Sequence, residues 1–163
     1  EKVIVVDLSE SRLAVAEKLG MITFKPDTGK LKHFLREQHG IVTNDARLGK
    51  QPGTDVFIEA TGVGSVFQEI CGIARKGARI VVVALHFAPA QLDMISLLMK
   101  ELQITGAIEY PVEFPAVIEM LSSGKVDVRP MISHSFPLSR FNEAFAQAQK
   151  QNEALKVLVD CQS

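Results

Sequence analysis

The sequence is poor in cysteine, in net charge and in long apolar runs. Only two of its 163 residues are cysteine, Cys71 and Cys161, and neither stands near another cysteine or a histidine at metal-site spacing. Two cysteines make no disulfide framework, so we expect both thiols to be reduced, as they are in the cytoplasm. The formal net charge of −1 gives no electrostatic case for binding nucleic acid or an anionic membrane.

Membrane-spanning and secretory patterns are absent too. No apolar run approaches the roughly 18 residues that cross a bilayer, and no signal-peptide pattern opens the sequence. With 47% hydrophobic and 23% charged residues, the composition is that of an ordinary globular domain. We therefore expect a cytoplasmic protein that binds small molecules, with no nucleic acid and no membrane among its partners.

Short apolar runs alternate with helical patterns along most of the sequence. The run Val3–Val6 is followed by Asp7 and by a helical pattern from Ser9 to Leu19. The same alternation predicts further strands at Met21–Phe24, Asp55–Ala60, Arg79–Leu85 and Leu102–Ile108, and helices around Leu31–Leu35, Ser65–Arg75, Met94–Leu98 and Phe114–Leu121. Strand-to-helix cycles of this kind predict an α/β fold with a doubly wound parallel sheet, because each parallel crossover needs a helix.

Two stretches depart from this alternation. Residues 40–54 are polar and contain glycine, and we expect them to be mostly loop. After Gly124 the pattern changes to an extended segment broken by Pro130, a helix with Phe141 and Phe145 on one face, and a last strand at Leu155–Val159. The sequence therefore predicts two domains, residues 1–125 and a C-terminal segment of residues 126–163.

Asp7 is the first candidate binding residue, because ligands of open α/β sheets bind at the carboxyl ends of the strands. In dinucleotide folds an acid about 20 residues after a glycine-rich turn accepts hydrogen bonds from the adenosine ribose. Such a carboxylate repels a 2′-phosphate, so it favours NAD over NADP. That glycine-rich turn would precede Glu1, so we expect a sheet that lacks its first strand. The alternative is that Asp7 caps the helix that starts near Ser9.

The turn Thr61–Gly64 holds two glycines of a G-x-G-x-x-G pattern but does not complete it. Phe67 takes the third glycine position, and the following strand ends in Ala84, Leu85 and His86 rather than in an acid. We therefore reject it as a phosphate loop. Its glycines still allow a cofactor to approach the backbone closely.

Few other residues suggest chemistry. His86 and His134 have no partner visible in the sequence, and we expect them to be structural or surface residues. Glu59 is either a general acid or, more simply, a carboxylate buried near a strand turn or paired with a lysine. No arrangement of Ser, His and Asp or of Cys and His indicates a nucleophile.

Several stretches of the sequence resemble the medium-chain dehydrogenases, especially the zinc-containing alcohol and polyol dehydrogenases, and they occur in the same order as in that family. Val3–Gly20 is similar to the second strand and following helix of that family. Asp55–Gly62 resembles its fourth strand and turn, Gly77–Leu85 its fifth strand, and Glu101–Tyr110 its sixth strand. Pro130–Gln147 followed by Leu155–Asp160 resembles the segment that returns to the catalytic domain. The resemblance implies a Rossmann-like sheet without its first strand.

The resemblance also implies NAD as the cofactor and a set of contacts to it. Asp7 would hold the adenosine ribose, and Arg12 would flank the adenine, unless it is simply a solvated helix residue. Thr61 and Gly62 would approach the nicotinamide-side ribose. The remaining implied contacts are Ala84 and Leu85 under the nicotinamide, the backbone of Ala107 and Glu109 near its carboxamide, and Lys156 at the pyrophosphate. Ala84 stands where the family usually has glycine, which would crowd the cofactor slightly.

The implied activity is hydride transfer between an alcohol or polyol and nicotinamide, with zinc assisting in the intact parent. The zinc ligands of the family would lie upstream, so no catalytic residue and no metal ligand is assigned here, and these residues alone are predicted to be inactive. We also expect a homodimer or homotetramer through the edge strand Leu102–Ile108. Two alternatives stay open: a zinc-free NADPH-dependent quinone or enoyl reductase, and a non-catalytic Rossmann-like oligomerisation module.

Overall fold

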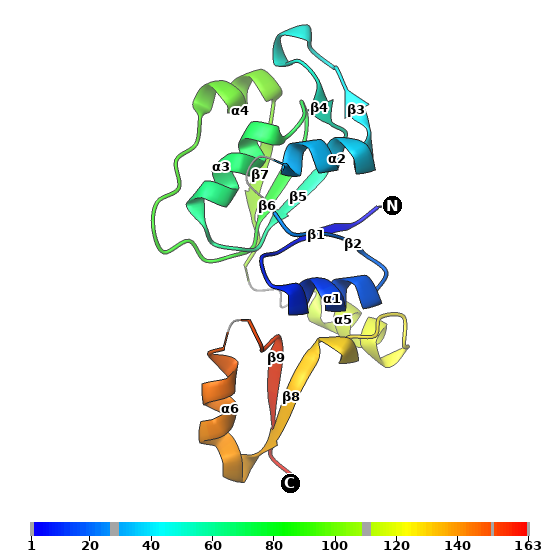
Figure 1. Ribbon diagram of the computed structural model, residues 1–163, viewed down its shortest axis with the longest axis vertical. Coiled ribbons are helices and arrows are strands. Elements are labelled where there is room, and N and C mark those ends of the chain that lie inside the picture. Colours follow the sequence, from blue (N-terminus) through cyan, green and yellow to red (C-terminus); the bar gives the residue numbers. More distant parts are fainter. Residues whose placement is uncertain (1, 27–29, 109–111, 151, 163) are drawn as a thin grey trace. The chain divides into compact units, whose positions relative to one another are not determined.

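The computed structural model describes residues 2–26, 30–108, 112–150 and 152–162 (Figure 1). The chain divides into two compact units. The first unit comprises residues 1–27 and 110–163, and the second unit comprises residues 28–109. The predicted domains, 1–125 and 126–163, are a different division, and they stay a prediction.

The first unit begins with a strand–helix–strand segment. Strand β1 (Ile4–Val6) pairs in parallel with β2 (Ile22–Phe24), and α1 (Glu10–Lys18) connects them. Helix α1 buries Leu13 and Ala16, which are three residues apart and therefore share one face. Gly20, with φ of +81°, ends the helix in the left-handed conformation that glycine adopts without strain.

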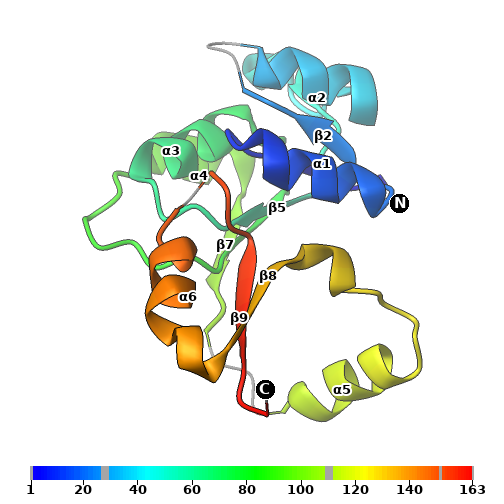
Figure 2. The same ribbon diagram turned by 60° about the horizontal axis from the view of Figure 1, so that its bottom comes forward.

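The rest of the first unit is built around a second parallel pair. Strand β8 (Ile132–Pro137) pairs with β9 (Lys156–Asp160), and α6 (Phe141–Ala148) lies alongside both strands (Figure 2). The unit also holds helix α5 and two 3₁₀ helices, at Phe114–Ser122, Arg129–Met131 and Leu138–Arg140. The extended segment expected around Pro130 therefore includes a single 3₁₀ turn at that proline.

The second unit contains a three-stranded parallel sheet. Strands β5 (Val56–Glu59), β6 (Arg79–Val82) and β7 (Gln103–Gly106) lie in the order β5–β6–β7, with α3 (Gly64–Ile73) and α4 (Met94–Lys100) as the crossovers. One face of the sheet packs against these helices, and its core consists of Phe67, Ile70, Cys71, Ala74, Ala78, Ile80 and Leu102. The sheet places β7 at an edge, as the sequence predicts.

The α/β fold with parallel strands is confirmed. In the common dinucleotide-fold order 3-2-1-4-5-6, the pair β2–β1 matches 3-2 and β5–β6–β7 matches 4-5-6.

Residues 40–54 contain more structure than the predicted loop. Helix α2 (Leu31–His39) is followed by an antiparallel pair, β3 (Ile41–Val42) with β4 (Gln51–Pro52), and by a 3₁₀ helix at Ala46–Leu48 between them. The pair has only two residues in each strand, which is too short to produce a periodic pattern in the sequence. The sequence also offers Asp27 or Thr28 as a cap for α2, and both lie outside the described residues.

Strand β6 is also shorter than predicted. The sequence predicts a strand to Leu85, but the ladder ends at Val82, which pairs with Glu59 of β5 and Gly106 of β7. Both neighbouring strands end at this level, and after the bond from the Val83 amide to the carbonyl oxygen of Glu59 the chain turns away from the sheet.

Lys100, at the end of α4, is buried against the end of α3. Its ammonium group donates hydrogen bonds of 2.7 Å to the carbonyl oxygens of Cys71 and Gly72. These carbonyls belong to the last turn of α3, where no amide of the helix can reach them. Burial lowers the pKa of Lys100. Its two hydrogen bonds join the two crossover helices.

None of the helices in the described parts of the chain combines the length and apolarity that crossing a membrane requires.

Candidate functional site

Two turns meet at the carboxyl ends of β5 and β6. Gly62, in the turn after β5, has φ of +71°, and a Cβ atom there would lie 2.5 Å from the carbonyl oxygen of Leu85. The same Cβ would lie 3.7 Å from the Cβ of Ala84. Only glycine permits so close an approach. Four of the predicted cofactor residues are thus brought together: Thr61, Gly62, Ala84 and Leu85.

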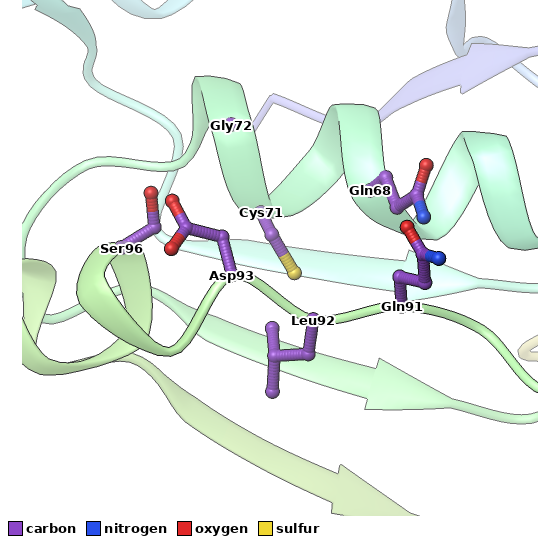
Figure 3. Close-up of a pocket in the computed structure, with 7 residues that line it drawn as sticks. All are labelled: Gln68, Cys71, Gly72, Gln91, Leu92, Asp93 and Ser96. Atoms are coloured by element: carbon purple, nitrogen blue, oxygen red, sulfur yellow. The ribbon is translucent and has the colours of Figure 1, made fainter.

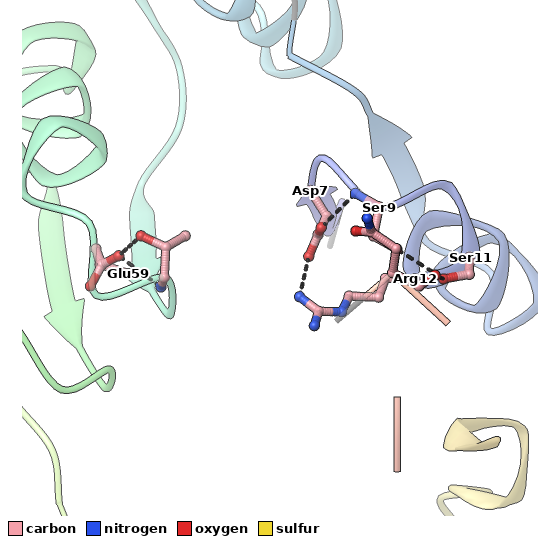
Figure 4. Close-up of polar contacts among 7 residues, drawn as sticks. Asp7, Ser9, Ser11, Arg12 and Glu59 are labelled. Atoms are coloured by element: carbon pink, nitrogen blue, oxygen red, sulfur yellow. Dashed lines mark hydrogen bonds and ion pairs between the residues drawn. The ribbon is translucent and has the colours of Figure 1, made fainter. Parts of the chain in front are cut away.

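Glu59, the last residue of β5, is buried beneath this pair of turns. Its Oε1 accepts hydrogen bonds from the backbone amides of Thr61 (2.8 Å) and Gly62 (3.1 Å), and from the Thr61 hydroxyl (Figure 4). Its Oε2 lies 2.7 Å from Nε2 of His86, in the turn after β6. Of the interpretations open from the sequence, burial near a strand turn is therefore correct, and the side-chain partner is a histidine rather than a lysine.

The hydrogen bonds decide the charge of Glu59. Burial by itself would raise the pKa of this carboxyl, but the bonds from Thr61, His86 and Gly62 outweigh it, so the pKa is lowered. Glu59 is therefore ionised at neutral pH and can only accept hydrogen bonds. It follows that Nε2 of His86 carries a hydrogen and donates a hydrogen bond to Glu59.

Ala107 follows β7 at the same end of the sheet. Its amide donates a hydrogen bond of 3.0 Å to the carbonyl oxygen of Val82, which extends the β6–β7 ladder by one residue. Glu109, the other residue predicted near the carboxamide, lies outside the described residues. The second unit therefore places Thr61, Gly62, Ala84, Leu85 and Ala107 at the carboxyl ends of three adjacent strands.

Asp7 and Arg12 come together in the first unit. Asp7 follows β1, and its Oδ1 accepts a hydrogen bond of 2.8 Å from the amide of Ser9, the residue that precedes α1 (Figure 4). Its Oδ2 lies 3.4 Å from Nη1 of Arg12. The N-cap residue of α1 is Ser9 and no side chain caps that helix, so Asp7 holds the segment before α1 rather than capping its first turn. A carboxylate has about four lone-pair positions, so these two contacts leave room for a further donor.

Lys156 opens β9 in the first unit. Its side chain is exposed, and its carbonyl oxygen accepts a hydrogen bond of 3.1 Å from the Ser133 hydroxyl. His134 lies beside Ser133, and its Nε2 is 3.2 Å from the side-chain amide nitrogen of Gln147. That nitrogen only donates, so His134 accepts through Nε2. His134 therefore links β8 to α6, as expected of a structural histidine.

A cavity of about 410 Å³ lies in the second unit, beside α3 and the segment that leads into α4 (Figure 3). None of the predicted cofactor residues lines it; its lining is Gln68, Cys71, Gly72, Gln91, Leu92, Asp93 and Ser96. The Cys71 side chain points toward this segment, and burial raises the pKa of its thiol. The thiol therefore stays protonated and is a poor nucleophile.

The part of the chain that the structure describes contains no cluster of three or more His, Cys, Asp or Glu side chains placed to hold a metal ion. None of the described residues is therefore assigned as a zinc ligand.

Parallel strands with these orders in each unit, a carboxylate after β1 and a glycine-dependent turn after β5 are typical of dinucleotide-binding α/β domains. A sequence model of the zinc-binding dehydrogenases matches residues 2–123. The chain belongs to this family.

Relatives of known name extend this result along the whole chain. The 2-dehydro-3-deoxy-L-galactonate 5-dehydrogenase of Pseudoalteromonas atlantica is 31% identical over 98% of this chain, and the sorbitol dehydrogenase of Rattus norvegicus is 33% identical over 98%. A solved alcohol dehydrogenase from Escherichia coli CFT073, in complex with NADH, superposes with a TM-score of 0.80 and 25% identity over 96% of this chain. The chain spans 44%, 43% and 44% of the lengths of these three proteins.

Proposed function

We propose that this chain is the cofactor-binding part of an NAD-dependent alcohol or polyol dehydrogenase. Bound nicotinamide supplies the carbon that exchanges a hydride with the substrate. The residues of this chain bind and orient the cofactor. We assign no catalytic residue to them, and we expect residues 1–163 alone to be inactive.

The position of the Asp7 carboxylate is the observation that supports NAD rather than NADP as the cofactor. Its carboxylate stands at the carboxyl end of a parallel strand, is partly exposed, and retains acceptor capacity beside Ser9 and Arg12. Two adjacent ribose hydroxyls can donate to such a group. A 2′-phosphate would instead bring negative charge against it, so NADP is disfavoured.

Five further residues are proposed as cofactor contacts at the strand ends of the second unit. Thr61 and Gly62 approach the nicotinamide-side ribose, Ala84 and Leu85 lie under the nicotinamide, and Ala107 contacts the carboxamide through its backbone. The left-handed Gly62 supports this, because a backbone without a side chain lets a ligand come close. Arg12 at the adenine, Lys156 at the pyrophosphate and Glu109 at the carboxamide remain part of the same proposal.

The names of the relatives support an alcohol or polyol as the substrate. Sorbitol dehydrogenase and 2-dehydro-3-deoxy-L-galactonate 5-dehydrogenase are named for substrates that carry several hydroxyl groups. Zinc is proposed for the intact protein only, on the family name. A cytoplasmic location is proposed on the sparse cysteines, and a homodimer or homotetramer is proposed because β7 has an open edge in the described sheet.

The test is a titration of the full-length protein with NADH and with NADPH. We expect NADH to bind at least about tenfold more tightly, which is the effect of one unfavourable charge contact at the ribose. Asp7→Ser is expected to reduce this preference, whereas Asp45→Asn, which alters a carboxylate of the 40–54 segment, is expected to leave it unchanged. Tighter binding of NADPH would favour the zinc-free quinone or enoyl reductase, and binding of neither would favour the oligomerisation module.

A further inference from the structure

The carboxylate of Glu59 joins the two turns that follow β5 and β6. One oxygen accepts from the amides of Thr61 and Gly62, and the other accepts from the His86 ring at 2.7 Å. The side chain of Glu59 is 0% exposed and that of His86 is 16% exposed. A single buried charge therefore fixes both turns, and water does not compete strongly for its hydrogen bonds.

The two turns also touch directly, so their spacing is sensitive to this carboxylate. Gly62 has no room for a Cβ against the carbonyl oxygen of Leu85, and Leu85 is bonded to His86. The His86 ring meets the Phe67 ring edge-on, with centroids 6.3 Å apart and planes at 76°. The ring is thus packed on α3 and hydrogen-bonded to β5. These two contacts fix the position of the backbone at the neighbouring Leu85.

The other ring nitrogen of His86, Nδ1, does not help to hold the ring in the described structure. Nδ1 is buried and has no hydrogen-bond partner in the described part of the chain. The bond from Nε2 to Glu59 is therefore the polar contact that can orient this ring. A buried polar ring with one nitrogen unsatisfied costs stability.

We propose that His86 is a positioning residue for the nicotinamide half of the cofactor site. It acts through Glu59, which it holds in place, and Glu59 in turn holds the Thr61–Gly62 turn against Ala84 and Leu85. This inference rests on the proposed function only in naming nicotinamide as the ligand. The link between the two turns stands on the contacts themselves.

The binding test uses the full-length protein with His86→Leu, which keeps bulk but has no donor, and His86→Gln, whose side-chain amide can donate near the position of Nε2. We expect His86→Leu to weaken NADH binding about tenfold, the cost of one hydrogen bond to a charged group. His86→Gln is expected to restore most of the affinity. Binding of AMP, which lacks the nicotinamide half, is expected to stay unchanged in both variants.

A matched control is His33→Leu, because His33 pairs with Glu37 on the exposed surface of α2. It is expected to change neither NADH nor AMP binding. Equal weakening of NADH and AMP by His86→Leu, or a His86→Gln variant no better than His86→Leu, would overturn the inference.

A second readout needs no cofactor. Amide hydrogen exchange of Thr61 and Gly62 is expected to become about tenfold faster in His86→Leu, because loss of one partner loosens the carboxylate that protects them. The ¹⁵N shifts of the His86 ring in the wild type are expected to show the proton on Nε2. Unchanged exchange would overturn the inference even where NADH binds normally, whereas failure of the wild type to bind NADH would overturn the proposed function instead.

Discussion

Gly62 lies in contact with Leu85 across the ends of two neighbouring strands, and a methyl group in place of its hydrogen would stand 2.5 Å from the Leu85 carbonyl oxygen. The obstacle is backbone, which cannot rotate away as a flexible side chain would. Gly62 also has φ of +71°, a conformation that strains other residues.

Gly62→Ala is therefore expected to lower the free energy of unfolding by at least about 2 kcal/mol, combining backbone strain with a steric clash. Urea denaturation of the full-length protein measures this. Gly72→Ala is the matched control, since Gly72 lies in α3 and an added Cβ would meet nothing within 4 Å. That variant should be neutral or slightly stabilising; the same loss in both variants would contradict the geometry at Gly62.

Lys100→Met is expected to destabilise the protein by about 1–3 kcal/mol, because two carbonyl oxygens at the buried end of α3 lose their donor. Relief from burying a charge offsets part of this cost. Thermal or urea unfolding gives the value. Lys76→Met serves as control: Lys76 pairs with Glu101 at a more exposed site, and exposed pairs contribute less than about 1 kcal/mol.

The charge of Glu59 predicts a pH dependence with a definite sign. Its pKa is lowered in the folded protein, so at low pH the unfolded chain binds more protons than the folded one. The stabilisation is present above the unfolded-state pKa of about 4.3 and is lost as the pH falls through the folded pKa.

Glu59→Gln removes this pH-dependent contribution of Glu59 to the free energy of unfolding. At pH 7 the variant is expected to be less stable than the wild type by about 2 kcal/mol, the cost of weakening bonds to a buried charge. The difference should shrink as the pH falls below about 4.3. Urea midpoints measured across this range test it, with Glu69→Gln on the exposed side of α3 as control. A difference that grows toward acid pH would refute the assignment.

The free edge of β7 predicts how the proposed oligomer can be disrupted. The amides of Gln103 and Ala107 bond to β6, so by the alternation of a parallel strand the amide of Gly106 points to the open edge. Gly106→Pro removes that donor without removing a β6–β7 bond, and it is expected to shift the protein to smaller species in sedimentation velocity. Gly106→Ala should leave the assembly intact. Identical sedimentation of both variants would exclude this edge as the interface.

Much of the site follows from the sequence because parallel strands fix it. Once β5 and β6 are recognised as neighbours, the residues after them, Thr61 and Gly62 with Ala84 and Leu85, must meet at one edge of the sheet. Periodicity also locates most of the helices and strands, since each buries one face. Those predictions need only pattern and strand order.

The contact between Glu59 and His86 needed more than a pattern. The two residues are 27 positions apart, and their hydrogen bond depends on the path of the turn after β6, which no periodicity describes. One signal was available: an acid that ends a buried strand requires donors, and the next strand end offered a histidine. The Lys100 contact was hidden for the same reason, because lysine is normally exposed.

The two cysteines differ in a way that is useful in the laboratory. Cys71 is packed in the core of the second unit with a thiol that resists ionisation, whereas Cys161 is exposed just beyond β9. Of these two cysteines, a maleimide dye should consequently react with Cys161 and leave Cys71 unmodified while the second unit stays folded. Modification at Cys71 would then serve as a sensitive sign that the second unit has opened.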